Sequence, residues 1–295
     1  MTSVGVIAHA AKRLGGGLDE LRRILAANGV TDPPWREVPK SKHVPGRVGE
    51  LVDQGVDLLF VWGGDGTVQR AIDALAGRPV TIAILPAGTA NLLATNLGLP
   101  EDLEACVRIG LHGARRSIDV GKIKGERFAV MAGAGLDAMM IRDAGDGLKD
   151  RVGRIAYVWT GARNTRAQPV KMSIDVDGKP WFRGTASCVL VGNVSDVLGG
   201  LAVFPHAAPD DGWLDIGVVT ADGAWEWART LGRAVVGDVS TSPFVQTSTG
   251  RSFEVRMKDR TLYQVDGGDR KRVKKLKIKV KPGAITVCVP EEGTR

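Results

Sequence analysis

The chain of 295 residues has a formal net charge of +7 and 43% hydrophobic residues. This length is enough for two domains with complete cores, and the moderate positive charge favours acidic ligands or anionic membrane surfaces. Aromatic residues make up only 5% and no nucleic-acid-binding motif is present, so we expect no nucleic-acid partner. Three scattered cysteines, no secretory leader pattern and no apolar run long enough to span a bilayer favour a soluble, cytoplasmic protein.

The first part of the chain predicts alternating strands and helices. Continuous apolar runs predict strands at 4–8, 57–62 and 80–85, and helical spacing of apolar residues predicts helices near 18–28, 68–77 and 91–97. Apolar strands separated by helices are typical of a parallel sheet covered on both faces. We therefore predict an α/β domain over residues 1–116.

The pattern changes from about Ser117 onward. Apolar and polar residues alternate in 170–176, after which Asp177-Gly178 predicts a hairpin turn, and they alternate again in 276–280. This period of two indicates antiparallel strands with one face in water. Two helical stretches are expected at 155–163 and 225–235. Residues 117–295 are therefore predicted to form a second, mainly β domain.

The motif Gly63-Gly64-Asp65-Gly66-Thr67 follows one of the buried strands and precedes a helix. Glycines let the backbone approach an anion, and a helix N-terminus presents N–H groups to it. The carboxylate of Asp65 would repel bare phosphate, so its presence indicates a bridging cation or a proton to be moved. The motif is neither a Walker A loop nor a dinucleotide fingerprint, and a plain strand-to-helix connection is the alternative.

A second turn of the same kind, Pro86-Ala87-Gly88-Thr89-Ala90-Asn91, follows the strand at 80–85. Turns after parallel strands meet at the carboxyl edge of a sheet, where ligands bind. We therefore expect the two glycine turns to hold one nucleotide together.

These two turns resemble those of the diacylglycerol kinase catalytic-domain family, which includes soluble bacterial lipid kinases, sphingosine kinases and ceramide kinases. Further blocks resemble the family in the same order along nearly the whole chain: Ile118–Gly121, Ala132–Asp137, Phe204–Asp215, Val265–Gly267 and Pro282–Ile285. The resemblance implies an N-terminal α/β domain with a parallel sheet, like that of NAD kinases and phosphofructokinases, and a C-terminal antiparallel β-sandwich that binds lipid. It also implies an enzyme that transfers the γ-phosphate of ATP to a lipid hydroxyl, that of diacylglycerol or a related lipid, with ATP and Mg²⁺ as cofactors.

The resemblance also assigns roles to individual residues. Asp65 is expected to orient the metal or the attacking hydroxyl, and Asp266 to accept the hydroxyl proton. The nucleotide site is expected to include Gly63, Gly64, Gly66, Thr67, Gly88, Thr89 and Asn91. A structural magnesium ion is expected on an acidic motif formed by Asp210, Asp211 and Asp215, with Asp211 as the main ligand.

The chain departs from the family at two places. Where the family's first strand leads into an Asn-Pro pair, this chain has His9-Ala10-Ala11-Lys12, so His9 or Lys12 is the candidate for phosphate contact; a strand-end cap is the alternative for His9. The family's Asp-Gly-Glu near the C-terminus is replaced by Asp266-Gly267-Gly268-Asp269. Either Asp266 acts as the base alone, or Asp269 reaches into the vacancy, or the segment is only a hairpin turn.

The basic segment 270–277 has two interpretations. It docks on an anionic membrane, or it is a solvated edge strand whose lysines discourage aggregation. The partners expected are a lipid substrate, a transient anionic membrane surface and, as one option, a second copy of the chain in a homodimer. We expect the protein in the cytoplasm, peripherally associated with the membrane.

Two other functions compete with a lipid kinase. NAD kinases share the Gly-Gly-Asp-Gly-Thr motif and the two-domain arrangement, but they normally carry an Asn-Glu pair that this chain lacks. The second alternative is a catalytically inactive lipid- or nucleotide-binding protein, because Gly268 stands where the family has glutamate.

Overall fold

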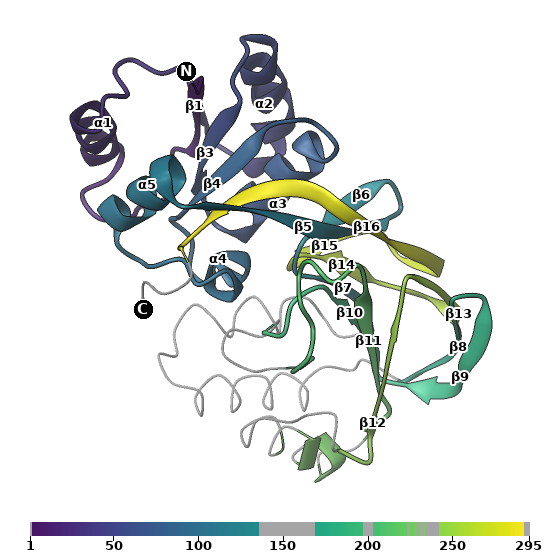
Figure 1. Cartoon of the computed structure of the whole chain (residues 1–295). Coiled ribbons are helices and arrows are strands. Elements are labelled where there is room, and N and C mark those ends of the chain that lie inside the picture. The colour runs from purple at the N-terminus through teal and green to yellow at the C-terminus, as the bar shows by residue number, and fades with distance from the viewer. Residues whose placement is uncertain are drawn as a thin grey trace. The chain divides into compact units, whose positions relative to one another are not determined.

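The computed structural model describes residues 2–135, 169–196, 203–222, 225–227, 229, 230, 233 and 242–291. The chain divides into two compact units (Figure 1). The first unit comprises Met1–Ile118 together with Gly283–Arg295, and the second comprises Asp119–Pro282.

The first unit is built on a parallel sheet. Its strands lie in the order β2 (Trp35–Val38), β1 (Val4–His9), β3 (Leu58–Gly63) and β4 (Thr81–Pro86). All four run parallel, and the end of β16 (Val273–Val289) adds a further parallel strand beside β4. The continuous apolar runs therefore form buried strands, as predicted; β2 is too short and too polar to have been found from its pattern.

Helices cover both faces of this sheet. They are α1 (Leu18–Ala27), α2 (Val44–Asp53), α3 (Asp65–Leu75), α4 (Leu92–Asn96) and α5 (Leu103–His112), with a 3-10 turn η1 (Ser41–His43). α1 and α5 share a core with Phe60 and Trp62, whereas α2 packs on α3 and β1. Because successive strand residues point to opposite faces, the complete burial of β3 requires both layers.

The second unit contains two antiparallel sheets. In one sheet β16 is followed by β13 (Ser252–Thr261), β8 (Val170–Val176) and β9 (Lys179–Ala186). The other has the order β12 (Val245–Gly250), β11 (Leu214–Val219), β10 (Cys188–Gly192), β7 (Met131–Ala134), β14 (Tyr263–Val265) and β15 (Gly268–Asp269). A hairpin of β5 (Ala114–Ile123) and β6 (Glu126–Phe128) adjoins β16.

One apolar core unites the two sheets of the second unit. It joins side chains such as Ile174, Val255 and Leu276 from the first sheet to Val191 and Ile216 from the second. This arrangement is a β-sandwich, so the predicted fold class is confirmed.

The predicted hairpin turn is also present. Asp177 and Gly178 have φ angles of 48° and 78°, the positive values that a two-residue hairpin turn requires. The expected helix at 155–163 lies outside the described residues, and of 225–235 the described positions 225–227, 229, 230 and 233 are helical. Across the part of the chain that the structure describes, none of the helices has the length and apolarity to cross a bilayer.

Candidate functional site

Three turns leave the same edge of the parallel sheet. Ala8 of β1 pairs with Trp62 of β3, and Gly63 of β3 pairs with Pro86 of β4, so the three strands end side by side. The turn after β1 and the two glycine turns therefore all begin at this carboxyl edge. In parallel sheets this is the edge at which ligands bind.

The two glycine turns are in backbone contact. The Ala87 N–H donates to the Gly63 carbonyl at 3.1 Å. A Cβ on Gly88 would lie 2.4 Å from the Gly64 Cα, and a Cβ on Gly64 would lie 3.0 Å from the Gly88 Cα. Neither position has room for a side chain, so glycine is needed at both for close packing. The expectation that the two turns lie together is confirmed.

Asp65 connects the two turns. It is the first residue of α3, and its Oδ1 accepts from the Leu92 N–H, the first of α4, at 2.7 Å. Burial raises the pKa of the Asp65 carboxyl, and hydrogen bonds from the backbone around Leu92 oppose that rise. One side of this carboxylate is therefore a fixed structural acceptor.

Asn91 fixes the shape of the second turn. Its φ of 47° is left-handed, and its side-chain oxygen accepts from the Gly88 N–H at 2.9 Å. Its Nδ2 donates to the carbonyls of Pro86 and Gly88 at 3.0 and 2.9 Å. The side-chain amide of Asn91 thus hydrogen-bonds within its own turn, as asparagine side chains commonly do.

The other turn residues differ in exposure. Gly66 and Thr89 are exposed, whereas Thr67 is only 2% exposed. The Thr67 hydroxyl lies 3.1 Å from that of Ser41, a residue that sequence reasoning missed. Thr67 also packs against Gly63, where a Cβ would come within 2.5 Å of it. Thr67 therefore supports the first turn from inside.

The turn after β1 is tied to the same edge. The Trp62 indole N–H donates to the Lys12 carbonyl at 3.2 Å, and His9 Nδ1 accepts from the Ala11 N–H at 3.3 Å. Burial, followed by the charge of Lys12, lowers the pKa of His9. His9 thus terminates its strand as a predominantly neutral ring at pH 7, and both candidate residues lie beside the glycine turns.

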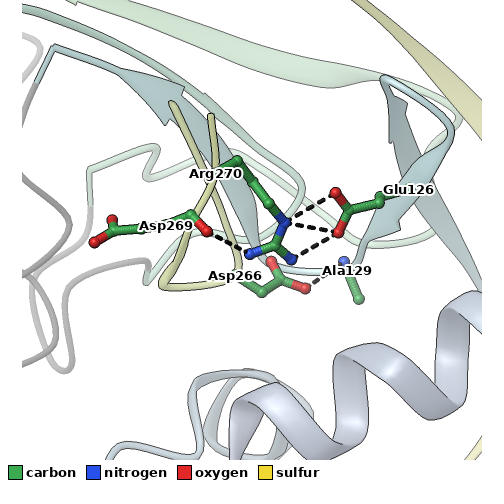
Figure 2. A network of polar contacts seen from close by, with 5 residues as sticks. All are labelled: Glu126, Ala129, Asp266, Asp269 and Arg270. Atoms are coloured by element: carbon green, nitrogen blue, oxygen red, sulfur yellow. Dashed lines mark hydrogen bonds and ion pairs between the residues drawn. The ribbon is translucent and has the colours of Figure 1, made fainter. Parts of the chain in front are cut away.

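In the second unit Asp266 is held by backbone donors. Its carboxylate accepts from the N–H groups of Ala129, Val130 and Met131 at 3.0, 3.1 and 2.8 Å (Figure 2 draws the first of these). Asp266 is 8% exposed and has a left-handed φ of 41°. These bonds join the β14–β15 turn to the start of β7.

A half-buried ion pair lies beside Asp266. Arg270 Nε lies 2.9 and 2.8 Å from the two carboxylate oxygens of Glu126, and Nη1 donates to the Asp269 carbonyl at 3.0 Å. A Cβ on Gly268 would lie 2.7 Å from the same Nη1, so the guanidinium crowds this position. The exposed Asp269 side chain points away from the pair (Figure 2). The sequence offered no indication of the pairing, since its partners are 144 residues apart.

The acidic motif is partly assembled. Asp210 and Asp211 are exposed, and Asp211 Oδ1 accepts from the Trp213 N–H at 2.9 Å. Asp215 accepts from the Thr249 hydroxyl at 2.6 Å, and burial together with the charge of Asp211 raises its pKa. Among the described residues, no three His, Cys, Asp or Glu side chains come close enough to hold a metal ion.

Asp119 anchors the loop that carries this motif. Its carboxylate accepts from the Gly212 N–H at 2.6 Å and its own N–H donates to the Pro209 carbonyl at 2.6 Å. Asn193 Nδ2 donates to the carbonyls of Asp119 and Ala129 at 2.9 and 3.0 Å. Asp119 belongs to a block that resembles the family, but its anchoring role is visible only in the fold.

Comparison with known proteins identifies the family. The diacylglycerol kinase catalytic domain matches residues 11–123, and the YegS C-terminal NAD kinase beta sandwich-like domain matches residues 130–289. The chain belongs to the diacylglycerol kinase and YegS-like lipid kinase family. It is 31% identical over 247 residues to a relative from Pseudomonas aeruginosa named YegS-like lipid kinase. This alignment covers 82% of this chain and 80% of the relative. It is 28% identical over 216 residues to the diacylglycerol kinase of Bacillus subtilis, 72% of this chain and 71% of the relative.

Solved structures share the fold of this family member. A crystal structure of a diacylglycerol kinase from Bacillus anthracis has a TM-score of 0.78 at 24% identity and covers 97% of this chain and 96% of its own. An NAD kinase from Archaeoglobus fulgidus has a TM-score of 0.56 at 13% identity, over 97% of this chain and 93% of its own. At such identities the likeness concerns the fold alone.

Proposed function

We propose that this protein is an ATP-dependent kinase that transfers the γ-phosphate of ATP to the hydroxyl of a lipid, diacylglycerol or one related to it. The observation that carries the proposal is the pair of glycine turns in backbone contact at one sheet edge, connected by Asp65. Family membership supports the reaction class, and the site chemistry supports the nucleotide.

The turns suit a triphosphate because they offer backbone without side chains. Gly64 and Gly66 bracket the start of α3, whose 11 residues direct N–H groups and a positive dipole end toward this edge. Exposed Gly66 and Thr89 are proposed to contact the phosphates. Thr67 and Asn91 are proposed to stabilise the shape of the turns, because their side-chain polar atoms already hydrogen-bond to other groups of the protein.

The turn after β1 would add positive charge to this site. Lys12 is half-buried and its carbonyl is fixed by Trp62, so its ammonium is the proposed phosphate contact of this segment. His9 is assigned a lesser part, because a neutral ring contributes a hydrogen bond and little charge.

Asp65 fits a magnesium ion at this site. Burial disfavours its negative charge, and a bound cation would offset that cost. Mg²⁺ commonly takes only one or two carboxylates together with substrate phosphates, so a three-carboxylate cluster is not required. When bound, the ion neutralises charge on the phosphate oxygens.

For the second unit we assign two different roles to the hairpin carboxylates. Three backbone donors occupy the Asp266 carboxylate, which suits a positioning residue that fixes the turn. Asp269, on the strand β15 that follows this turn, is exposed and is our candidate for accepting the proton of the lipid hydroxyl.

The acidic motif is proposed to hold a second, structural magnesium ion. Asp211 and Asp215 interact unfavourably as two negative charges, and Asp215 is also partly desolvated. A divalent cation would relieve both effects, and the exposed Asp210 precedes this pair in the motif.

Incubation with labelled ATP, Mg²⁺ and a panel of purified lipids tests the function. The expected result is one labelled lipid whose formation is lost in Asp65→Asn. Labelled NADP formed from NAD would instead establish the NAD kinase alternative. ATP binding without turnover of any lipid or of NAD would establish the inactive binding protein and refute the proposal.

A further inference from the structure

The strand β16 hydrogen-bonds with β13, β4 and β5. Its lysine-bearing part pairs with β13, where Lys275 lies opposite Arg256 and Lys277 opposite Glu254, whereas the pairing with β4 lies farther along, at Thr286 and Val287. The interpretation that the lysines protect an edge from aggregation stays a prediction. The side chains that lie beside these lysines across the sheet indicate a further role for their charge.

The outward face of this sheet carries positive side chains across several strands (Figure 1 shows β8, β9 and β13 together). Alternate residues of β16 are buried, and the lysines between them are exposed. The register places four outward residues in one row across four strands: Lys275, Arg256, Ser173 and Arg183.

The surface around this row is hollowed by about 390 Å³. The polar lining of this basic hollow consists of Lys171, Ser173, Arg183, Thr185, Arg256 and Lys258. Its apolar lining comes from Met172 and Met257, and among the residues that the structure describes no acidic side chain contributes. Four positive side chains and two hydroxyls thus surround one shallow site.

The nearest carboxylates compensate only part of this charge. Arg256 contacts both Asp175, at 2.8 Å, and Glu254, and Lys275 lies 2.7 Å from Glu254. Within the described residues no ion pair involves the other cations of the basic hollow, which are Lys171, Arg183 and Lys258. Like charges gathered in this way repel one another, and an anionic partner would relieve that repulsion.

We propose that the basic hollow and the exposed lysines of β16 (Lys275, Lys277 and Lys279) form the surface with which this protein docks on bilayers of anionic phospholipid, with a headgroup phosphate in the hollow. The inference rests on the proposed function, because a lipid kinase must reach a substrate that resides in a bilayer. It assigns the docking surface to β8, β9, β13 and β16.

The composition of the surface favours a bilayer over nucleic acid. Of the described residues that line the hollow, none is an aromatic on which a base could stack, and stacking is the usual support for binding single strands. Cations spread over four neighbouring strands match a planar anionic surface, where each lysine or arginine strengthens binding about fivefold.

Co-sedimentation with vesicles tests the surface. The protein is mixed, at low and at high salt, with vesicles of phosphatidylcholine alone or with vesicles that contain about 3 parts in 10 of phosphatidylglycerol. The triple variant Lys171→Gln, Arg183→Gln, Lys258→Gln is expected to bind the anionic vesicles about a hundredfold more weakly than the unmodified protein. The matched control, Arg23→Gln, Arg78→Gln, Lys122→Gln, removes the same charge from exposed positions outside the hollow and is expected to bind almost normally.

A second measurement separates docking from catalysis. With diacylglycerol dispersed in neutral detergent the triple variant is expected to keep wild-type turnover, and to lose it only on anionic vesicles. Equal vesicle binding by the two triple variants, or no binding by the unmodified protein, overturns the docking surface. Oligonucleotide binding that is lost only in the triple variant of the hollow also overturns the docking surface. No turnover of any lipid of the panel in detergent, with hollow-dependent vesicle binding intact, refutes the proposed function but not the docking surface.

Discussion

Gly88→Ala should separate the two glycine turns. The new Cβ would lie 2.4 Å from the Gly64 Cα and 2.6 Å from the Asn91 side-chain oxygen. Ordinary contacts between such atoms begin near 3.4 Å, and the Gly64 Cα is a backbone atom that no side-chain rotation can displace, so the two backbones must move apart by about 1 Å. Overpacking of this kind costs about 1–3 kcal/mol of stability, and a displacement of about 1 Å at a catalytic site costs about a hundredfold in rate.

Titration calorimetry with ATP and thermal unfolding measure these effects. Gly49→Ala is the matched control, because a Cβ there meets nothing within 4 Å and lies in the interior of α2. The control should be neutral or slightly stabilising, since alanine favours a helix over glycine by about 1 kcal/mol. Wild-type ATP affinity and wild-type stability in Gly88→Ala would refute the packing of the two turns as the basis of the site.

Three further outcomes follow from the geometry. Asp65→Asn keeps an acceptor for the Leu92 N–H but removes the charge, so turnover should fall about a hundredfold or more while the melting temperature hardly changes. A loss of turnover accompanied by a large fall in melting temperature would contradict the assigned role. Because burial raises the pKa of Asp65 above the ordinary 3.8, the folded state binds its proton more tightly than the unfolded state. Stability should therefore decrease as pH rises through that raised pKa. As pH is lowered, kcat/KM should fall with a midpoint above pH 3.8, because catalysis needs the ionised carboxylate. Both pH dependences should be absent in Asp65→Asn, and a pH profile shared by the two proteins would exclude Asp65 as their source. Glu126→Gln leaves the half-buried guanidinium of Arg270 without a charged partner and should destabilise the protein by about 1–3 kcal/mol, measured by urea unfolding. Glu50→Gln, in a more exposed pair, should cost clearly less, and similar costs would show that burial of the pair is unimportant.

The local order of apolar residues was sufficient for the parallel sheet. β1, β3 and β4 are continuous apolar runs, and a strand buried on both faces needs no partner to be recognised as such. The two glycine turns were equally visible, because steric freedom and anion approach depend on residues adjacent in the chain. Their meeting at one edge followed from the rule that parallel strands share a carboxyl end.

Contacts between residues distant in sequence decide which polar side chains of the site are already hydrogen-bonded within the protein. Asp65 accepts a hydrogen bond from the first N–H of α4, and Asp266 accepts one from the first N–H of β7, whereas Asp269 on the adjoining strand β15 is exposed. Nothing in the spacing of these aspartates separates an accessible carboxylate from one that three N–H groups occupy. Only the pairing of strands far apart along the chain creates those donors.

The charge of the second unit follows the same division. The sequence showed lysines alternating with apolar residues, which was enough to place them on the wet face of a strand. It contained no information on which strands lie beside β16, because cross-strand register is a long-range property. Folding gathers Lys171, Arg183 and Lys258 from three other strands into one hollow, and electrostatic repulsion becomes a property of the surface only once they are neighbours.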